Sequence, residues 1–261
     1  MVGAGLVLLW RVVFSPAARA ERREAPLSAW EIPLTSFLLF GCCVTLGAAF
    51  LAMLAATLAR SLGFSSDAVV IASGAGAQLG MLIGALLGPV RIAGLVRPGE
   101  NSRALLGGIA TFLIALPLLL VTAAASDGLV RAAGLPTDKQ DLLGMFARME
   151  SPGLLAAMIA LAIVIAPLTE EVVFRAGIFR YLRTRLPHAL ALALPAVAFA
   201  ALHVNWKTLA GLASLPPLVL LAVLFSLAYE RTGHIGVPIV AHALFNLNTI
   251  ACVLSGLVKP P

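Results

Sequence analysis

Long apolar runs alternate with short polar intervals along almost the whole chain. A helix needs about 20 apolar residues to cross a bilayer, and seven runs approach or exceed that length. These runs are Ser36–Leu62, Ala68–Val90, Ala104–Ala125, Gly153–Phe179, Ala189–Ala210, Pro216–Tyr229 and Ile235–Leu257. An eighth run, Met1–Phe14, is short and contains Arg11, so it is either a truncated first helix or no span. The pattern predicts an all-α fold, a polytopic transmembrane helix bundle with seven to eight membrane-spanning helices.

Two polar intervals have features of their own. Ser15–Pro33 carries charges of both signs and predicts a cytoplasmic linker. Its residues 18–20 imitate a signal-peptide cleavage site, but the basic region that precedes the apolar core of a signal peptide is missing. In the second interval, Gln140–Met149 places apolar residues among charged ones, which predicts an amphipathic helix on the outer surface or capping the bundle.

One apolar run carries a regular series of glycines. Gly76, Gly80, Gly84 and Gly88 recur every four residues and therefore share one face of a helix. A face without side chains lets a neighbouring backbone approach closely. We interpret it as a packing face within the monomer, in preference to a dimer seam.

Composition and charge agree with a membrane protein. The chain is 61% hydrophobic and only 11% charged, with a mean hydropathy of +1.01, which excludes an ordinary soluble domain. Its net charge of +6 fits membrane orientation better than nucleic-acid binding. If the spans alternate, eleven Lys and Arg residues lie on one side and six on the other, and the positive-inside rule makes the first side cytoplasmic. The three cysteines lie within apolar runs without metal-ligand spacing, as packing residues do.

Very few ionisable side chains lie inside the apolar runs, where a charge costs about 2.5 kcal/mol or more. Away from the ends of the runs they are two carboxylates, Glu170 and Glu171, two histidines, His203 and His242, and Arg175. Lys207, one turn after His203, indicates that its helix either ends early or borders a hydrated cavity. We interpret these five as the whole polar set within the membrane. Glu171 and Arg175 are four residues apart, which predicts an ion pair on one helix face. Glu170 points about 100° away and stays free for chemistry.

The runs Gly153–Phe179, Ala189–Ala210 and Ile235–Leu257 carry these residues at similar depths in the membrane, which predicts that they lie close together. The arginine-rich return after the fourth run places Glu170 and His203 side by side on antiparallel helices. Counting from the interface, Glu170 lies about 13 Å deep and His242 about 11 Å deep. Phe199 precedes His203 by one turn, and Asn246 follows His242 by one turn, so each shares the face of its histidine.

These residue types suit hydrolysis of a peptide bond. Glu170 can act as general base on a water molecule that His203 binds and orients. His242 and Asn246 can donate hydrogen bonds to the oxyanion that develops on the carbonyl oxygen. Glu171, Arg175 and Phe199 are predicted to support these four residues without taking part in the chemistry themselves. Glu170, His203 and His242 could also supply a His₂Glu zinc site, although we favour the site without metal.

Three motifs contain these residues: EExxxR at Glu170–Arg175, FxxxH at Phe199–His203 and HxxxN at His242–Asn246. With them the chain resembles the CPBP family, which comprises CAAX prenyl proteases of the Ras-converting-enzyme type and bacterial Abi, or bacteriocin-processing, proteins. The resemblance covers about Gly134–Asn248. It implies a glutamate base, a first histidine on the water, and a second histidine with asparagine as oxyanion site. Members of this family have been described both as metalloproteases and as glutamate proteases.

From the residues and the resemblance together we expect a CAAX-protease-like intramembrane endopeptidase, a hydrolase. It would lie in the cell membrane as a multi-pass protein, with its active site in the cytoplasmic half of the bilayer. Residues 1–133 would hold the N-terminal transmembrane helices and linker, and residues 134–258 the protease core, within one integral-membrane domain. Its substrate would be a membrane-embedded or lipid-anchored peptide or protein. We expect no nucleic acid and no cofactor, with zinc as the alternative.

Two rival functions fit a polytopic protein with buried charges. A transporter would usually show inverted repeats or paired helices broken by Gly or Pro, and the sequence shows neither. A catalytically idle immunity or scaffold protein with the same residues is the other rival. Cleavage assays on site variants distinguish it from a protease.

Overall fold

The computed structural model describes residues 1–15, 27, 30–87, 101–134, 141–206, 208 and 210–257. Every regular element in these residues is a helix, which confirms the predicted all-α fold. Most of the predicted linker Ser15–Pro33, with its charges, and Gly88 lie outside the described residues.

Six helices are long and apolar enough to cross a membrane, counted within the described ranges. They are α3 (Leu34–Ser61), α4 (Ser66–Leu87), α5 (Asn101–Ala132), a composite helix over residues 152–183, α11 (Leu215–Thr232) with the short 3₁₀ turn η4 (Ala210–Ser214) before it, and α12 (Gly236–Leu254). Two shorter apolar helices are α1 (Val2–Leu9), continued by η1 (Trp10–Phe14), and α10 (His188–Ala201). These eight elements correspond to the seven predicted runs and the short Met1–Phe14, so the polytopic bundle is confirmed.

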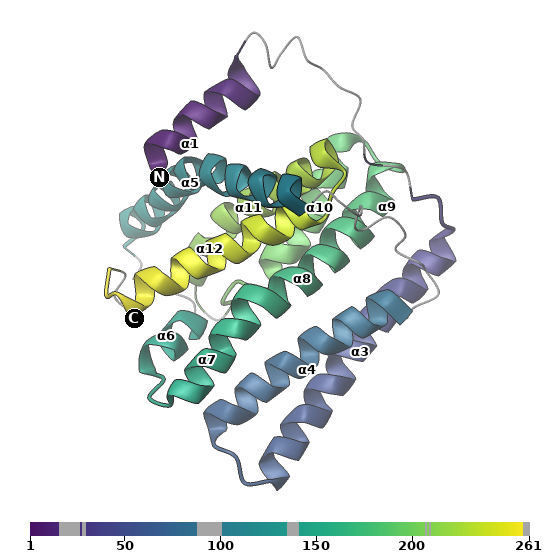
Figure 1. The fold of residues 1–261 in the computed structure, drawn as a ribbon, viewed down its shortest axis with the longest axis vertical. Helices are drawn as coiled ribbons and strands as arrows, with labels where there is room; N and C mark the ends of the chain where they lie inside the picture. Colours follow the sequence, from purple (N-terminus) through teal and green to yellow (C-terminus); the bar gives the residue numbers. More distant parts are fainter. Residues whose placement is uncertain are drawn as a thin grey trace.

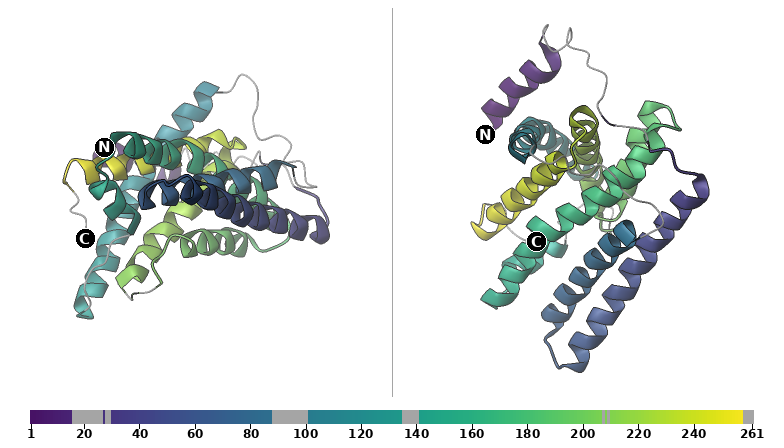
Figure 2. Two further views of the ribbon diagram at one scale, coloured as in Figure 1. Left: turned by 90° about the horizontal axis from the view of Figure 1, so that it is seen from below. Right: turned by 45° about the vertical axis from the view of Figure 1, so that its right-hand side comes forward.

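Most of the long helices, together with the short α1, form a row (Figure 1). Neighbours in this row are α1, α5, α12, the composite helix, α4 and α3, each in contact with the next. Figure 2 shows α1 and the α3–α4 hairpin at opposite edges of the molecule. Helices α10 and α11 pack against each other and against the composite helix, so the centre of the bundle lies among these two, the composite helix and α12.

Helix α10 ends before its apolar run does. The apolar run Ala189–Ala210 predicted a span, but the helix covers His188–Ala201, which at 1.5 Å per residue is about 21 Å. Beyond it, the His203 N–H donates to the Ala200 carbonyl oxygen at 2.9 Å, an i to i+3 bond that tightens the last turn. His203 therefore lies in a turn at the inner end of a short helix.

The chain nevertheless returns to the side from which α10 started. His188, at the beginning of α10, lies 2.8 Å from a carboxylate oxygen of Glu230, near the end of α11. Arg183, at the end of the composite helix, binds the same carboxylate. The end of the composite helix, the beginning of α10 and the end of α11 therefore meet at Glu230. They lie on the same side of the bundle, as alternating spans predict.

The predicted amphipathic helix is present as α6 (Asp141–Arg148). Phe146 is buried in a cluster with Met158, Ile250 and Val253. Helix α6 therefore caps the bundle where α12 ends. The preceding helix α5 continues past the end of the predicted run Ala104–Ala125, through Asp127 to Ala132.

The glycines of α4 pack against α3, as their spacing predicted. A Cβ on Gly80 would lie 2.0 Å from the Gly47 carbonyl oxygen, and one on Gly84 would lie 2.3 Å from that of Cys43. On Gly76 it would meet the Leu51 carbonyl oxygen at 2.4 Å. No side chain fits between these backbones, so glycine is required along this face.

We predict that Gly80→Ala destabilises the protein by about 1–3 kcal/mol, because the new methyl group forces α3 and α4 apart. Thermal unfolding in detergent measures the change. The control is Gly41→Ala in α3, where nothing lies within 4 Å of the added Cβ. There the loss of backbone freedom in the unfolded chain makes alanine neutral or stabilising. Equal melting temperatures for the two variants would contradict the close packing.

Candidate active site

The composite helix contains two widened, π-helical segments. Its parts are α7 (Pro152–Ala160), the π-helical η2 (Leu161–Ile165), α8 (Ala166–Glu171), the π-helical η3 (Val172–Phe179) and α9 (Arg180–Arg183). The regular segment between the two π segments ends with Glu170 and Glu171. Such segments are frequent at functional sites because they redirect side chains and free backbone groups.

The first π segment leaves a backbone carbonyl for Asn246. In a regular α-helix the Ala166 N–H would bond to Ala162, but here it donates to the Leu161 carbonyl oxygen. The next residue, Pro167, has no N–H to give. Asn246 Nδ2 instead donates to the Ala162 carbonyl oxygen at 2.7 Å. Pro167 and the widened turn thus explain how α12 is tied to the composite helix at Asn246.

Glu171 Oε1 accepts two hydrogen bonds inside the bundle. Arg175 Nη1 donates to it at 3.0 Å, which confirms the predicted ion pair. His242 Nδ1 donates to the same oxygen at 2.8 Å. The Glu171 side chain is fully buried, so both partners compensate a charge that water cannot reach. Glu171 therefore holds His242 directly, a contact that the spacing alone did not predict.

The Arg175 guanidinium is buried between two aromatic rings. Its Cζ lies 4.8 Å from the ring centre of Phe199 and 5.3 Å from that of Phe225. Nη2 donates to the Ala222 carbonyl oxygen at 3.2 Å. These contacts combine cation–π attraction with a backbone hydrogen bond, and they connect the composite helix to α10 and α11.

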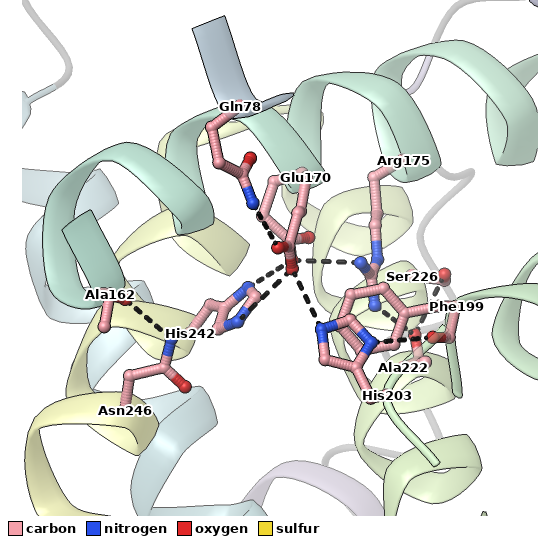
Figure 3. Close-up of polar contacts among 11 residues, drawn as sticks. Gln78, Ala162, Glu170, Arg175, Phe199, His203, Ala222, Ser226, His242 and Asn246 are labelled. Atoms are coloured by element: carbon pink, nitrogen blue, oxygen red, sulfur yellow. Dashed lines mark hydrogen bonds and ion pairs between the residues drawn. The ribbon is translucent and has the colours of Figure 1, made fainter. Parts of the chain in front are cut away.

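Glu170 occupies the centre of the polar cluster (Figure 3). Its Oε1 accepts a hydrogen bond from Gln78 Nε2 of α4 at 2.9 Å. Its Oε2 lies 3.7 Å from His203 Nε2 and 3.9 Å from His242 Nε2. These separations exceed a direct hydrogen bond. Oε2 and the two ring nitrogens therefore face one another without a direct hydrogen bond.

Both histidines are oriented through their Nδ1 atoms. His203 Nδ1 lies 2.8 Å from the Phe199 carbonyl oxygen, and His242 Nδ1 is bonded to Glu171. A carbonyl and a carboxylate can only accept, so both Nδ1 atoms carry the proton. In the neutral ring, Nε2 then presents a lone pair towards Glu170. The Phe199 ring supports this arrangement, with its centre 4.5 Å from that of His203.

Exposure differs among the three side chains that face one another. The His203 side chain is 34% exposed, whereas those of Glu170 and His242 are 9% and 5% exposed. The polar cluster therefore opens past His203, beyond the inner end of α10.

A metal ion is a possibility that the residue types raise. Two imidazoles and a carboxylate match the His₂Glu set of catalytic zinc sites, and each imidazole has its second nitrogen held by an acceptor. Donors on a tetrahedral zinc ion would lie about 3.4 Å apart, closer than the Nε2–Oε2 separations of 3.7 and 3.9 Å. Among the described residues, no three His, Cys, Asp or Glu side chains are placed to hold a metal. The arrangement as it stands does not fit the ion.

The structure brings together Glu170, His203 and His242, with Glu171 and Arg175 beneath them. Asn246 lies one turn beyond His242 and donates a hydrogen bond to the backbone carbonyl of Ala162. The five ionisable residues are not the whole polar set, because Gln78 also takes part. Its signal in the sequence is an amide in the middle of an otherwise apolar, glycine-rich run.

Comparison with known families agrees with the motifs. A family model described as Type II CAAX prenyl endopeptidase Rce1-like matches residues 152–248. This stretch contains all three motifs, and the match confirms the resemblance to the CAAX protease family. No match to a curated protein or to a solved structure was found.

We predict that Arg175→Met destabilises the protein by about 3–5 kcal/mol, because Glu171 would keep a buried charge without its cation. The double variant Glu171→Gln, Arg175→Met should regain much of this loss, since an amide oxygen can still accept from His242. Thermal unfolding in detergent measures both. Arg131→Met, at an exposed position in α5, is the control. A single variant as stable as the control would contradict the role of this pair.

Proposed function

We propose that this membrane protein, whose residues 152–248 match the Rce1-like CAAX prenyl endopeptidase family, is an intramembrane endopeptidase that uses Glu170 as its base. The observation that carries the proposal is the position of Glu170 Oε2. This buried carboxylate oxygen faces two imidazole nitrogens and has a direct hydrogen bond to neither.

Activation of water follows from the orientation of these groups. A water molecule between Glu170 Oε2 and His203 Nε2 can donate one hydrogen bond to each, because both atoms accept. Its lone pairs then point away from both and are free to attack a carbonyl carbon. As the new C–O bond forms, the proton moves to Glu170. Exposure of His203 favours entry of water and substrate from its side.

His242 and Asn246 are the proposed donors to the oxyanion. Asn246 Nδ2 has two hydrogens, and the bond to the Ala162 carbonyl uses one, leaving one for the substrate. Donation from His242 Nε2 requires a ring that carries both protons, for which Glu171 and Glu170 are the neighbouring counter-charges. Fixed donors at this point are worth about 3–4 kcal/mol each in other hydrolases.

The reaction ends with cleavage of the C–N bond. When the tetrahedral intermediate collapses, Glu170 returns the proton it took from water to the departing amine nitrogen. The products are a carboxylic acid and an amine, and the Glu170 carboxylate is restored. Glu171, Arg175 and Phe199 take no proton in this scheme; they hold the two histidines and the helix that carries Glu170.

The substrate we propose is a membrane-embedded or lipid-anchored peptide or protein. Glu170 lies nine residues before Phe179, where the apolar run ends, or about 13 Å at 1.5 Å per residue. A cleavage site at this depth is reached by a chain that is itself in or on the bilayer. By the positive-inside rule the arginine-rich end of the composite helix would face the cytoplasm, and the site would then lie in the cytoplasmic half of a cell membrane.

We predict that Glu170→Gln abolishes cleavage, because an amide cannot take the proton from water. His203→Ala should reduce kcat by about 100-fold or more, since the water loses its second acceptor. The measurement is proteomic comparison of membranes with wild type and each variant, followed by cleavage of the identified peptide in liposomes. Glu150→Gln, which alters an exposed carboxylate outside the site, is the control.

Cleavage that survives both site variants would overturn the mechanism. A cellular phenotype that persists in Glu170→Gln and His203→Ala, without any cleavage by the wild type, would instead favour the scaffold or immunity protein.

We predict that the reconstituted enzyme keeps its activity after treatment with a strong chelator and exchange into metal-free buffer, since the proposed base acts without a metal. Activity is measured before and after treatment, and again after addition of zinc. Loss of activity that zinc restores would assign Glu170, His203 and His242 as ligands and replace the glutamate mechanism with a zinc-dependent one.

A further inference from the structure

We propose that Gln78 of α4 is a positioning residue for Glu170, so that the α3–α4 hairpin is part of the catalytic unit. This inference rests on the proposed function, in which Glu170 is the base. Gln78 lies outside the matched residues 152–248 and outside the three motifs.

The glycine series determines which way Gln78 points. Gly76 and Gly80 face α3, where their Cα atoms approach its backbone. Gln78 is two residues from each and therefore points about 200° away, to the opposite side of α4. That side faces α8 and η3 of the composite helix. The same packing face that fixes α4 on α3 thus directs the amide towards Glu170.

Apolar packing holds α4 at the right distance from the composite helix. Met81, Leu82 and Ala85 lie in one cluster with Val172 and Val173, directly after the two glutamates. Gln78 is about one turn before this cluster. Its backbone is therefore anchored, and the amide is delivered from a helix that has little freedom to shift.

The hydrogen bond selects which oxygen of Glu170 is available. Gln78 Nε2 donates to Oε1 at 2.9 Å, whereas Oε2 makes no hydrogen bond to any described residue. A carboxylate with one oxygen bonded to a fixed donor does not rotate freely. Oε2 is thus kept opposite the Nε2 atoms of His203 and His242.

The chemistry of the two groups also fixes the orientation of the amide. An ionised carboxylate only accepts, so the NH₂ end of Gln78 faces it and the carbonyl end turns away. Methionine has a similar length and no donor, so Gln78→Met removes the hydrogen bond together with the amide oxygen Oε1, a buried acceptor that has no partner among the described residues. Asparagine keeps the donor but is shorter by one methylene group.

The first arm of the test is steady-state cleavage in liposomes. We expect Gln78→Met to lower kcat about 10- to 100-fold with KM changed less than twofold, as loss of a hydrogen bond to a charged group implies. Gln78→Asn should regain part of the rate. Leu79→Met, at a neighbouring exposed position on α4, should match wild type. An unchanged kcat in Gln78→Met would overturn the positioning role.

The second arm does not depend on cleavage. The melting temperature of Gln78→Met is compared in two backgrounds, wild type and Glu170→Ala. We expect a decrease in the first background, where Glu170 Oε1 loses its donor, and an unchanged or higher melting temperature in the second, where methionine replaces an amide that has already lost its acceptor. Equal changes in both backgrounds would overturn the contact.

The two arms also distinguish the proposals from each other. A wild type that cleaves no membrane peptide overturns the proposed function and the positioning role with it. A wild type that cleaves, together with a Gln78→Met variant of full kcat, overturns the role of Gln78 alone.

Discussion

The charge of a carboxylate buried in an apolar helix bundle must be compensated by protein groups, because water cannot reach it. The packing of the central helices in this protein depends on the groups that compensate Glu171. Its Oε1 accepts from Arg175 and from His242, which lie on different helices. Arg175 in turn lies between Phe199 and Phe225 and binds a carbonyl of α11. One buried charge therefore joins the composite helix, α10, α11 and α12, and it fixes the ring of a candidate catalytic histidine.

Two adjacent glutamates have different roles because their neighbours differ. Glu171 accepts hydrogen bonds from a cation and an imidazole N–H, and its side chain is fully buried. Glu170, one residue earlier and about 100° around the helix, meets an amide on one oxygen and two ring nitrogens across a gap on the other. The same residue type thus serves as a structural anchor at Glu171 and as a candidate base at Glu170.

Much of this was predictable, since it follows from local periodicity. Spacing of four residues predicted the Glu171–Arg175 pair and the contact of Phe199 with His203, and apolar runs predicted the helices. Lys207, one turn after His203, indicated either an early end of this helix or a hydrated cavity beside it, and hydropathy could not decide between the two because it does not report backbone turns. The partner of Asn246 depends on a widened turn before Pro167, a distortion that sequence periodicity does not reveal.

Gln78 was missed for a related reason. A search for ionisable groups passes over a neutral amide, although an amide in hydrocarbon also needs a partner. Its importance is visible only when α4 is placed against α8, which requires contacts between segments 92 residues apart. The glycines on one face of α4 pack closely on α3 and fix the position of the helix. The fixed helix in turn holds the Gln78 amide, on its other face, within hydrogen-bond distance of Glu170. A neutral polar residue opposite a glycine strip in an apolar helix is therefore a candidate for a functional site, just as a buried charge is.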